Sequence, residues 1–114
     1  MADRKVRDAD ITLATAVASA TTLDMRDMAA AVVAFGTMST SVTTLQLHVS
    51  NSSSGTFTRL YKTDGTAADL TLSPSTTEGR AYYLPDEAFG VEFVKLVAGH
   101  TAANGVTGVV MFKS

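Results

Sequence analysis

The sequence contains few side chains that could take part in chemistry, and its two histidines are the first to consider. His48 lies on the polar side of an alternating segment, and His100 lies in a loop of Gly, Ala and Thr residues. A metal site built on two histidines also needs a carboxylate ligand, and no spacing of Asp or Glu near either residue indicates one. We therefore interpret both histidines as surface or interface residues.

Neighbouring acidic groups are the second possibility. Asp86 and Glu87 follow Pro85, and a pair of carboxylates can serve as acid and base in glycoside hydrolysis. Pro85 also predicts the start of a short helical turn, where acidic side chains favour the positive end of the helix dipole. The connections are too short to form a substrate cleft, so we favour the structural interpretation of this pair.

Nucleophilic chemistry has no support in the sequence. The chain has no cysteine, which excludes disulfides, cysteine-bound zinc and thiol catalysis. Its many serines include no nucleophile-elbow motif. Asn51 begins a match to a glycosylation acceptor, but no secretion signal accompanies that match. We predict that the protein is not an enzyme and that it uses no cofactor and no metal.

Three tyrosines provide the one signal of a binding module. Tyr61, Tyr82 and Tyr83 could stack against sugar rings, although aromatic residues in strands more often belong to a core or an interface. The formal net charge is -2, and the basic residues near the N-terminus are interleaved with acids. Nucleic acid is therefore not an expected partner. No apolar run approaches membrane-spanning length, so no membrane partner is expected either.

Alternating strands must position these side chains. In residues 43–50, Leu45, Leu47 and Val49 alternate with polar residues, which is the period of a half-buried strand. Similar strand signals occur in residues 11–17, 56–62, 68–72, 80–84, 91–97 and 106–112. In residues 91–97 we expect Val91, Phe93 and either Leu96 or Val97 to point inward, because they are separated by Glu92 and Lys95.

Residues 23–35 fit two interpretations. Thr22 as N-cap and Gly36 after the last turn would bound a single helix, which the alanines favour. Val32, Val33 and Phe35 fit a buried strand equally well. Strands flank the segment on both sides, so we favour a strand, and both alternatives stay open at this point.

The segments together predict an all-β chain. About eight strands separated by turn signals every ten or so residues indicate an antiparallel β-sandwich, jelly-roll-like, with at most one short helical turn. At 114 residues and without an internal linker, the chain forms a single domain. We expect an N-terminal arm over residues 1–10, which a partner could order, and one sandwich domain over residues 11–114.

The order of these segments resembles a family of small tailed-phage virion proteins, some of which are similar to capsid decoration, or cement, proteins. The segments that carry the resemblance are residues 11–16, 23–26, 45–50, 60–66, 80–85 and 93–96, and the likeness extends from residue 11 to residue 113. Their order and spacing are more specific than any single motif. Two positions depart from the pattern: Asp27 stands where the family often has Gly, and Phe57 where it often has Trp.

The resemblance implies a structural protein that binds the assembled capsid shell and stabilises it. It implies a jelly roll, a homo-oligomer with a trimer favoured, the phage major capsid protein as partner, and assembly in the host bacterial cytoplasm followed by a place on the capsid surface. It supplies no catalytic residue. On this interpretation the interface candidates lie in the arm and in two loops, and they are Arg4, Lys5, Arg7, Ser53, Gly55, His100 and Asn104.

Two alternatives remain. The protein could belong to the phage tail, baseplate or head fibre, where it would be present in few copies. It could also be a carbohydrate-binding β-sandwich module that uses its tyrosines against sugar rings. Both alternatives share the predicted fold, so the sequence does not separate them from the decoration protein.

Overall fold

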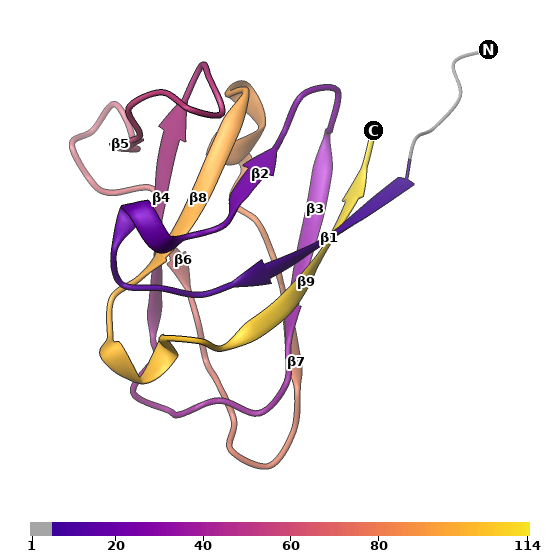
Figure 1. Ribbon diagram of the computed structural model, residues 1–114, viewed down its shortest axis with the longest axis vertical. Helices are drawn as coiled ribbons and strands as arrows, with labels where there is room; N and C mark the ends of the chain where they lie inside the picture. Colours follow the sequence, from indigo (N-terminus) through magenta and orange to yellow (C-terminus); the bar gives the residue numbers. More distant parts are fainter. Residues whose placement is uncertain (1–5) are drawn as a thin grey trace.

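Two antiparallel sheets packed face to face make up residues 6–114, the part of the chain that the computed structural model describes (Figure 1). The four-stranded sheet contains, in spatial order, β1 (Val6–Thr12), β9 (Thr107–Lys113), β3 (Ala30–Phe35) and β7 (Arg80–Tyr83). The five-stranded sheet contains β2 (Thr22–Asp24), β8 (Phe93–Ala98), β4 (Thr44–Ser50) and β5 (Thr58–Arg59), with β6 (Leu70–Thr71) also paired to β4.

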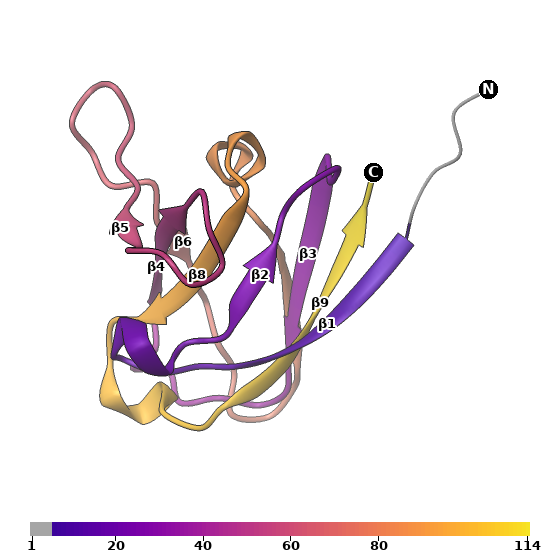
Figure 2. The same ribbon diagram turned by 45° about the horizontal axis from the view of Figure 1, so that its top comes forward.

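The strand pairing follows the topology of a jelly roll. β1 pairs with β9, β2 with β8, β3 with β7, and β4 with both β5 and β6. The first half of the chain therefore folds back on the second half as one long antiparallel ribbon, and the ribbon is wrapped into two sheets. β5 and β6 occupy a single strand position that the hairpin of residues 60–68 interrupts, and Figure 2 shows this hairpin projecting from the sandwich. The predicted all-β, jelly-roll-like sandwich is confirmed.

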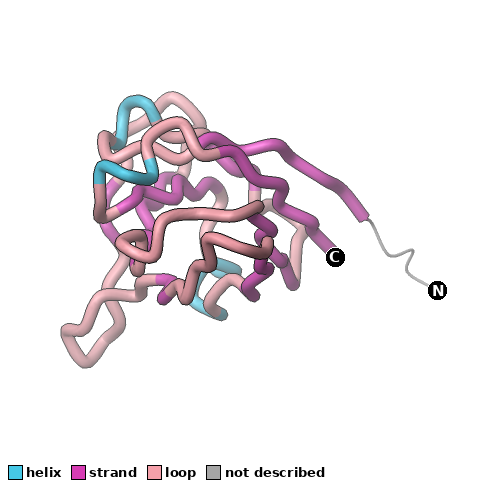
Figure 3. Tube along the Cα trace, turned by 90° about the horizontal axis from the view of Figure 1, so that it is seen from below, coloured by secondary structure: helices cyan, strands magenta, loops and turns pink. Residues whose placement is uncertain are grey.

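Helical structure within residues 6–114 is limited to three single 3₁₀ turns, η1 (Val17–Ser19), η2 (Asp86–Gly90) and η3 (Thr101–Ala103) (Figure 3). The sequence predicted η2 and allowed no other turn. The two additional turns lie in connections rich in Ala, Ser and Thr, where the backbone closes on itself: the Ala20 N–H donates to the Val17 carbonyl, and the Asn104 N–H to that of Thr101. The small side chains of these connections allow the backbone to form such short turns.

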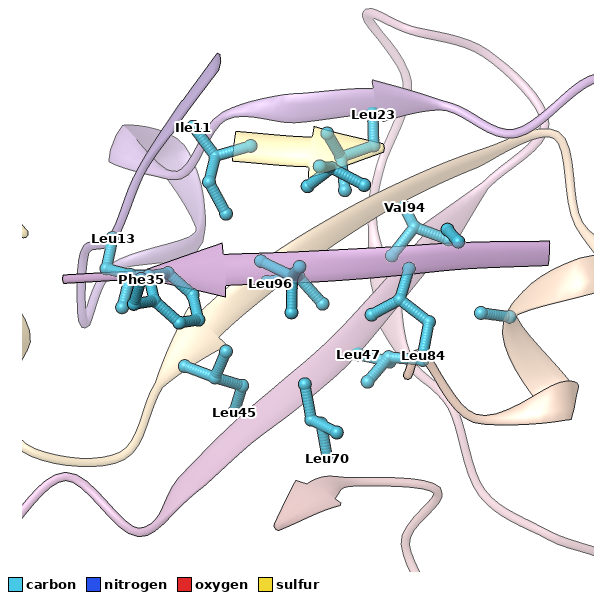
Figure 4. Close-up of a cluster of buried hydrophobic side chains, with 14 of the residues drawn as sticks. Ile11, Leu13, Leu23, Phe35, Leu45, Leu47, Leu70, Leu84, Val94 and Leu96 are labelled. Carbon is cyan, nitrogen blue, oxygen red and sulfur yellow. The ribbon is translucent and has the colours of Figure 1, made fainter. Parts of the chain in front are cut away.

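The core lies between the sheets and is built from every second residue of the facing strands (Figure 4). Leu45 and Leu47 of β4 are fully buried, as the alternation predicts, and Val49 packs against the edge of the same cluster. Burying a leucine of this kind stabilises the fold by roughly 2 kcal/mol. The polar members of β4 lie on the opposite face, where they are only half-buried.

Residues 23–35 form two strands, so the strand interpretation is confirmed and the helix is excluded. β2 ends at Asp24, and β3 begins at Ala30. Val33 is fully buried in the middle of β3, which pairs with β9 on one side and β7 on the other. In the connection between them Asp27 has φ 66°, a left-handed conformation that glycine adopts most readily and that Asp tolerates. The turn therefore has a backbone conformation in which glycine would also be accommodated.

The predicted phase of β8 was wrong at Phe93. Val94, Leu96 and Ala98 point into the core, whereas Phe93 lies on the outer face, 5.0 Å from the guanidinium carbon of Arg26. An aromatic ring covered by a cation can occupy such a half-exposed position. Val97 is buried as well, beside the segment that follows β1: Ala14 forms a bridge to Val97, and the Ala98 N–H donates to the Ala14 carbonyl.

The expected arm is, in its described part, a strand. Residues 6–10 belong to β1, and the pairing with β9 begins at Val6 opposite Lys113. Charged side chains alternate along β1 because it is an edge strand whose outward side faces solvent. The first strand therefore begins earlier than the predicted residue 11. Arg4 and Lys5 lie outside the described residues.

Candidate interaction surfaces

The predicted interface residues in the two loops lie at opposite ends of the sandwich. Ser53 and Gly55 belong to the connection between β4 and β5, at the end where β8 begins. His100 and Asn104 belong to the connection between β8 and β9, at the end where β8 finishes. The structure does not bring the two pairs together, so they cannot share one contact surface on a single partner subunit unless that subunit spans the whole molecule.

His100 and Asn104 both have partners within the chain. The Asn104 Oδ1 accepts hydrogen bonds from the backbone N–H of Thr15 at 3.0 Å and from its hydroxyl at 3.3 Å. The His100 Nδ1 accepts from the Ala102 N–H at 3.0 Å at the start of η3. These bonds hold the β8–β9 connection against the segment after β1, so the two side chains organise this end of the sandwich.

Ser53 and Gly55 lie in a turn that its own serines close. The Ser50 hydroxyl accepts from the Ser52 N–H at 3.2 Å, and the Gly55 N–H donates to the Ser52 carbonyl at 3.2 Å. A Cβ at position 55 would lie 2.9 Å from the Ser50 Oγ. Glycine is therefore needed here for the tight turn, which gives the residue a structural role independent of any partner.

Arg7 holds the two sheets together at the edge of the sandwich. Its guanidinium carbon lies 4.9 Å from the centroid of the Phe112 ring, and its Nη2 donates to the backbone carbonyl of Asp24. The residue that the sequence placed in a partner-binding arm thus connects β1 of one sheet to β2 of the other.

A polar hollow of about 850 Å³ opens beside Arg7 at the β2–β3 connection. Arg26 Nη2 lies 2.7 Å from the Asp24 Oδ2 there, and this hydrogen-bonded ion pair lowers the pKa of Asp24 to about 2. Asp27 and Glu92 also line the hollow. Its charges are of both signs and the two arginines already have partners, so it is not specific for an anion or a cation.

The acidic pair at η2 lies beside a lysine of the projecting hairpin. Asp86 and Glu87 lie in the first turn of η2, as predicted, and the Glu87 Oε1 lies 4.0 Å from the Lys62 Nζ. Within residues 6–114 no group of three or more His, Cys, Asp or Glu side chains is placed to hold a metal ion. No helix in the same part of the chain is long and apolar enough to cross a membrane.

The three tyrosines do not form one platform. Tyr82 is half-buried, and its hydroxyl accepts from the Ser73 N–H at 3.2 Å. Tyr83 is the next residue of β7 and therefore points to the other face of the sheet, where 79% of it is exposed. Tyr61 belongs to the hairpin on the other sheet and has the Arg59 guanidinium 5.5 Å from its ring centroid.

The outer face of the five-stranded sheet carries a polar cluster that the sequence did not predict. Arg59 Nη2 donates to the Asp69 Oδ2 at 2.7 Å, and the His48 Nε2 lies 3.1 Å from the Gln46 Oε1. Burial lowers the pKa of His48, and the positive charge of Arg59 lowers it further. The two ion-pair partners are ten residues apart in the chain, and no motif signals that the hairpin brings them together.

The outer face of the four-stranded sheet is apolar over its two central strands and charged along β1, and the apolar part is the reverse of the usual solvent-facing pattern. Its centre consists of Met111 and Val109 on β9 beside Val32 on β3, and 41% and 37% of the two β9 side chains are exposed. We call this surface the apolar face. Its members are Val6, Ala30, Val32, Ala34, Ala81, Tyr83, Val109 and Met111.

The apolar face could not be recognised from the sequence, because residues 109–112 are all apolar and fit one buried strand. In the structure they alternate, with Val110 and Phe112 in the core and Val109 and Met111 outside. A contiguous exposed apolar patch of this kind is a candidate contact surface. It is the strongest interaction feature in the described part of the chain.

No family model matches the chain, and neither a curated protein nor a solved structure is similar to it.

Proposed function

We propose that the protein is a structural component of a tailed-phage virion, a capsid decoration protein that binds the assembled shell and stabilises it. The observation that carries the proposal is the jelly-roll sandwich of residues 6–114, which presents an apolar sheet face suited to association with protein. The resemblance of the segment order to small virion proteins supplies the identity of the assembly.

The mechanism is the addition of many equal contacts. A decoration protein bridges neighbouring subunits of the major capsid protein and opposes the outward pressure of packaged DNA. Because each copy occupies an equivalent position, a modest contact repeated over the shell gives a large total stabilisation. The resemblance implies a homo-oligomer, and the capsid surface is its place in the virion.

The test is quantitative mass spectrometry of purified particles from the source phage. A copy number comparable to that of the major capsid protein supports decoration. A few copies per particle would move the protein to the tail, baseplate or head fibre. Absence from the particle would overturn the virion role altogether.

The carbohydrate-binding alternative has less support. Tyr61 and Tyr83 lie on different sheets, so they do not share one surface on which a sugar ring could stack.

A further inference from the structure

We propose that the apolar face binds the same face of a second copy of this chain. The contact is two-fold, and its axis runs parallel to the strands between β9 and β3. This inference does not depend on the virion role, and it replaces the three-fold association that the resemblance implies with a symmetric pair.

The register of the sheet arranges the apolar face in rows. One row consists of Asp8, Met111, Val32 and Tyr83, which lie opposite one another on β1, β9, β3 and β7. The next row along the strands has Asp10 on β1, followed by Val109, Ala34 and Ala81. Acidic groups thus stand only at the β1 edge of each row, while the remaining positions are apolar or aromatic.

A two-fold axis parallel to the strands pairs each row with the same row of the second copy, and it leaves Asp10 opposite Ala81 at the rim of the contact, where the carboxylate stays in water. It places β1 over β7 of the second copy and β9 over its β3, without changing the position along the strands. Asp8 then lies opposite Tyr83 of the second copy, whose hydroxyl can donate to the carboxylate. Met111 lies over Val32 of the second copy, so the centre of the contact is apolar.

The alternative axis, perpendicular to the strands, is disfavoured by charge. It would place β1 over β1 of the second copy, so that the acidic side chains Asp8 and Asp10 of both copies would oppose one another. Like charges brought together in an interface disfavour association strongly. Lys113 lies between Val6 and Ala30 in its row, at the C-terminal end of β9, where its long side chain can keep the ammonium group in water in either arrangement.

The area of the face suits a pair that dissociates on dilution. Four strands about 4.8 Å apart and about 20 Å long give a flat footprint on the order of 400 Å² per copy. The pair covers this footprint on both copies, on the order of 800 Å² of flat sheet before the relief of the side chains is counted, which is the scale of a small, transient interface. Two sheets can pack in this way with their strands within about 30° of each other.

The first experiment is sedimentation velocity of the full chain over a range of concentrations. The wild type should be a dimer that dissociates on dilution. Met111→Glu places a charge at the centre of the contact and should weaken dimerisation at least about a hundredfold. Thr71→Glu is the matched control, because it adds the same charge at an exposed strand position of the other sheet and should leave the dimer unchanged.

The second experiment tests the symmetry itself. Tyr83→Phe removes only the hydroxyl, so folding should be unaffected while the dimer weakens about tenfold, because two hydrogen bonds to carboxylates are lost. The chain contains no cysteine, so single cysteines report contacts without interference. A mixture of Met111→Cys and Val32→Cys proteins should form disulfide-linked dimers faster than either variant alone, and Thr71→Cys should form none above background.

Several results would overturn the inference. They are a protein that stays monomeric at all concentrations, a trimer, a dimer that Met111→Glu leaves intact, and cross-linking that shows no preference for the mixed pair. The outcome is separable from that of the particle assay. A dimer absent from virions would refute the virion role alone, and a monomer abundant in virions would refute the pair alone.

Discussion

Arg59 and Asp69 close the projecting hairpin of residues 60–68 with an ion pair, in which the Arg59 Nη2 lies 2.7 Å from the Asp69 Oδ2. Backbone hydrogen bonds continue the closure, with the Ala68 N–H donating to the Leu60 carbonyl at 3.0 Å. The Arg59 Nε and the Asp69 Oδ1 are buried and have no hydrogen-bond partner among the described residues. The pair is therefore partly desolvated, and each charge depends on the other.

Asp69→Asn should lower the urea midpoint of unfolding more than the control variant does, because it leaves the Arg59 guanidinium without its counter-charge. The measurement is urea unfolding at neutral pH. Glu78→Gln is the matched control, since it removes one member of the solvent-exposed pair with Arg80, and it should cost less than about 0.5 kcal/mol. Equal losses of stability in the two variants would show that the Arg59–Asp69 ion pair stabilises the fold no more than an exposed surface ion pair does.

Gly108→Ala should destabilise the sandwich by about 2 kcal/mol through overpacking. Gly108 of β9 lies opposite Phe35 of β3, and a Cβ there would be 2.6 Å from the Phe35 Cδ1 and 2.7 Å from the Ala34 carbonyl oxygen. The paired variant is Gly36→Ala, where a Cβ would meet no atom within 4 Å. It should be neutral or stabilise by about 0.5 kcal/mol. The measurement is the thermal unfolding midpoint of both variants. If Gly108→Ala left the midpoint unchanged, the close approach of β9 and β3 would not require glycine.

His48→Gln should flatten the dependence of stability on pH between about 7 and 5. The folded state holds the pKa of His48 below its ordinary value of about 6.5, so the unfolded chain binds the proton first as the pH falls. Wild-type stability should therefore be complete above that value and decline below it. Unfolding midpoints at several pH values provide the measurement. His100→Gln is the control, and loss of the pH dependence in that variant instead would refute the assignment.

Asp24→Asn should reduce the acid sensitivity of the fold between about pH 4 and pH 2. The carboxyl has a pKa of about 2 in the folded state against an ordinary value of 3.8, so its contribution is present above 3.8 and is lost as the pH falls towards 2. Solvent reaches about a third of the side chain, so screening limits the contribution to less than about 1 kcal/mol.

Arg26→Gln is the companion variant for this acid titration, because the Arg26 guanidinium is the main cause of the lowered pKa of Asp24. It should flatten the titration of stability to the same extent as Asp24→Asn. Thermal melts between about pH 4.5 and pH 2 give the comparison. If the loss of stability between about pH 4 and pH 2 were unaltered in either variant, the role of this ion pair would be disproved.

Local alternation made much of the fold predictable. Leu45 and Leu47 are separated by polar residues, so both the strand and its buried side could be inferred without knowledge of the neighbouring strands. The pairing partners of each strand could not be inferred. The first strand pairs with the last strand, and β3 also pairs with the last strand, and these segments come together only in the folded chain. Residues 30–35 show the limit: their apolar character is shared by helices and buried strands, and pairing on both sides of β3 decides between them.

The interaction surface was less predictable than the fold. Met111 lies in an apolar run, and its exposure follows from the register of β9 in the sheet, not from its own neighbours in the chain. The loop residues His100 and Asn104 were sought as interface groups because they are polar and lie in turns. Their hydrogen bonds to Ala102 and Thr15 give them local roles that only the folded loop reveals.

The position of β9 between β1 and β3 has a consequence for biosynthesis. Because β9 fills the centre of the four-stranded sheet, β1 has no strand partner in the described fold until residues 107–113 have left the ribosome. The jelly roll must therefore close after these residues emerge, and such non-local pairing typically takes milliseconds to seconds. Until then the nascent chain exposes two unpaired strand edges together with the hydrophobic surface between them, so early chaperone capture or crowding on polysomes should determine how much of the protein reaches its folded state.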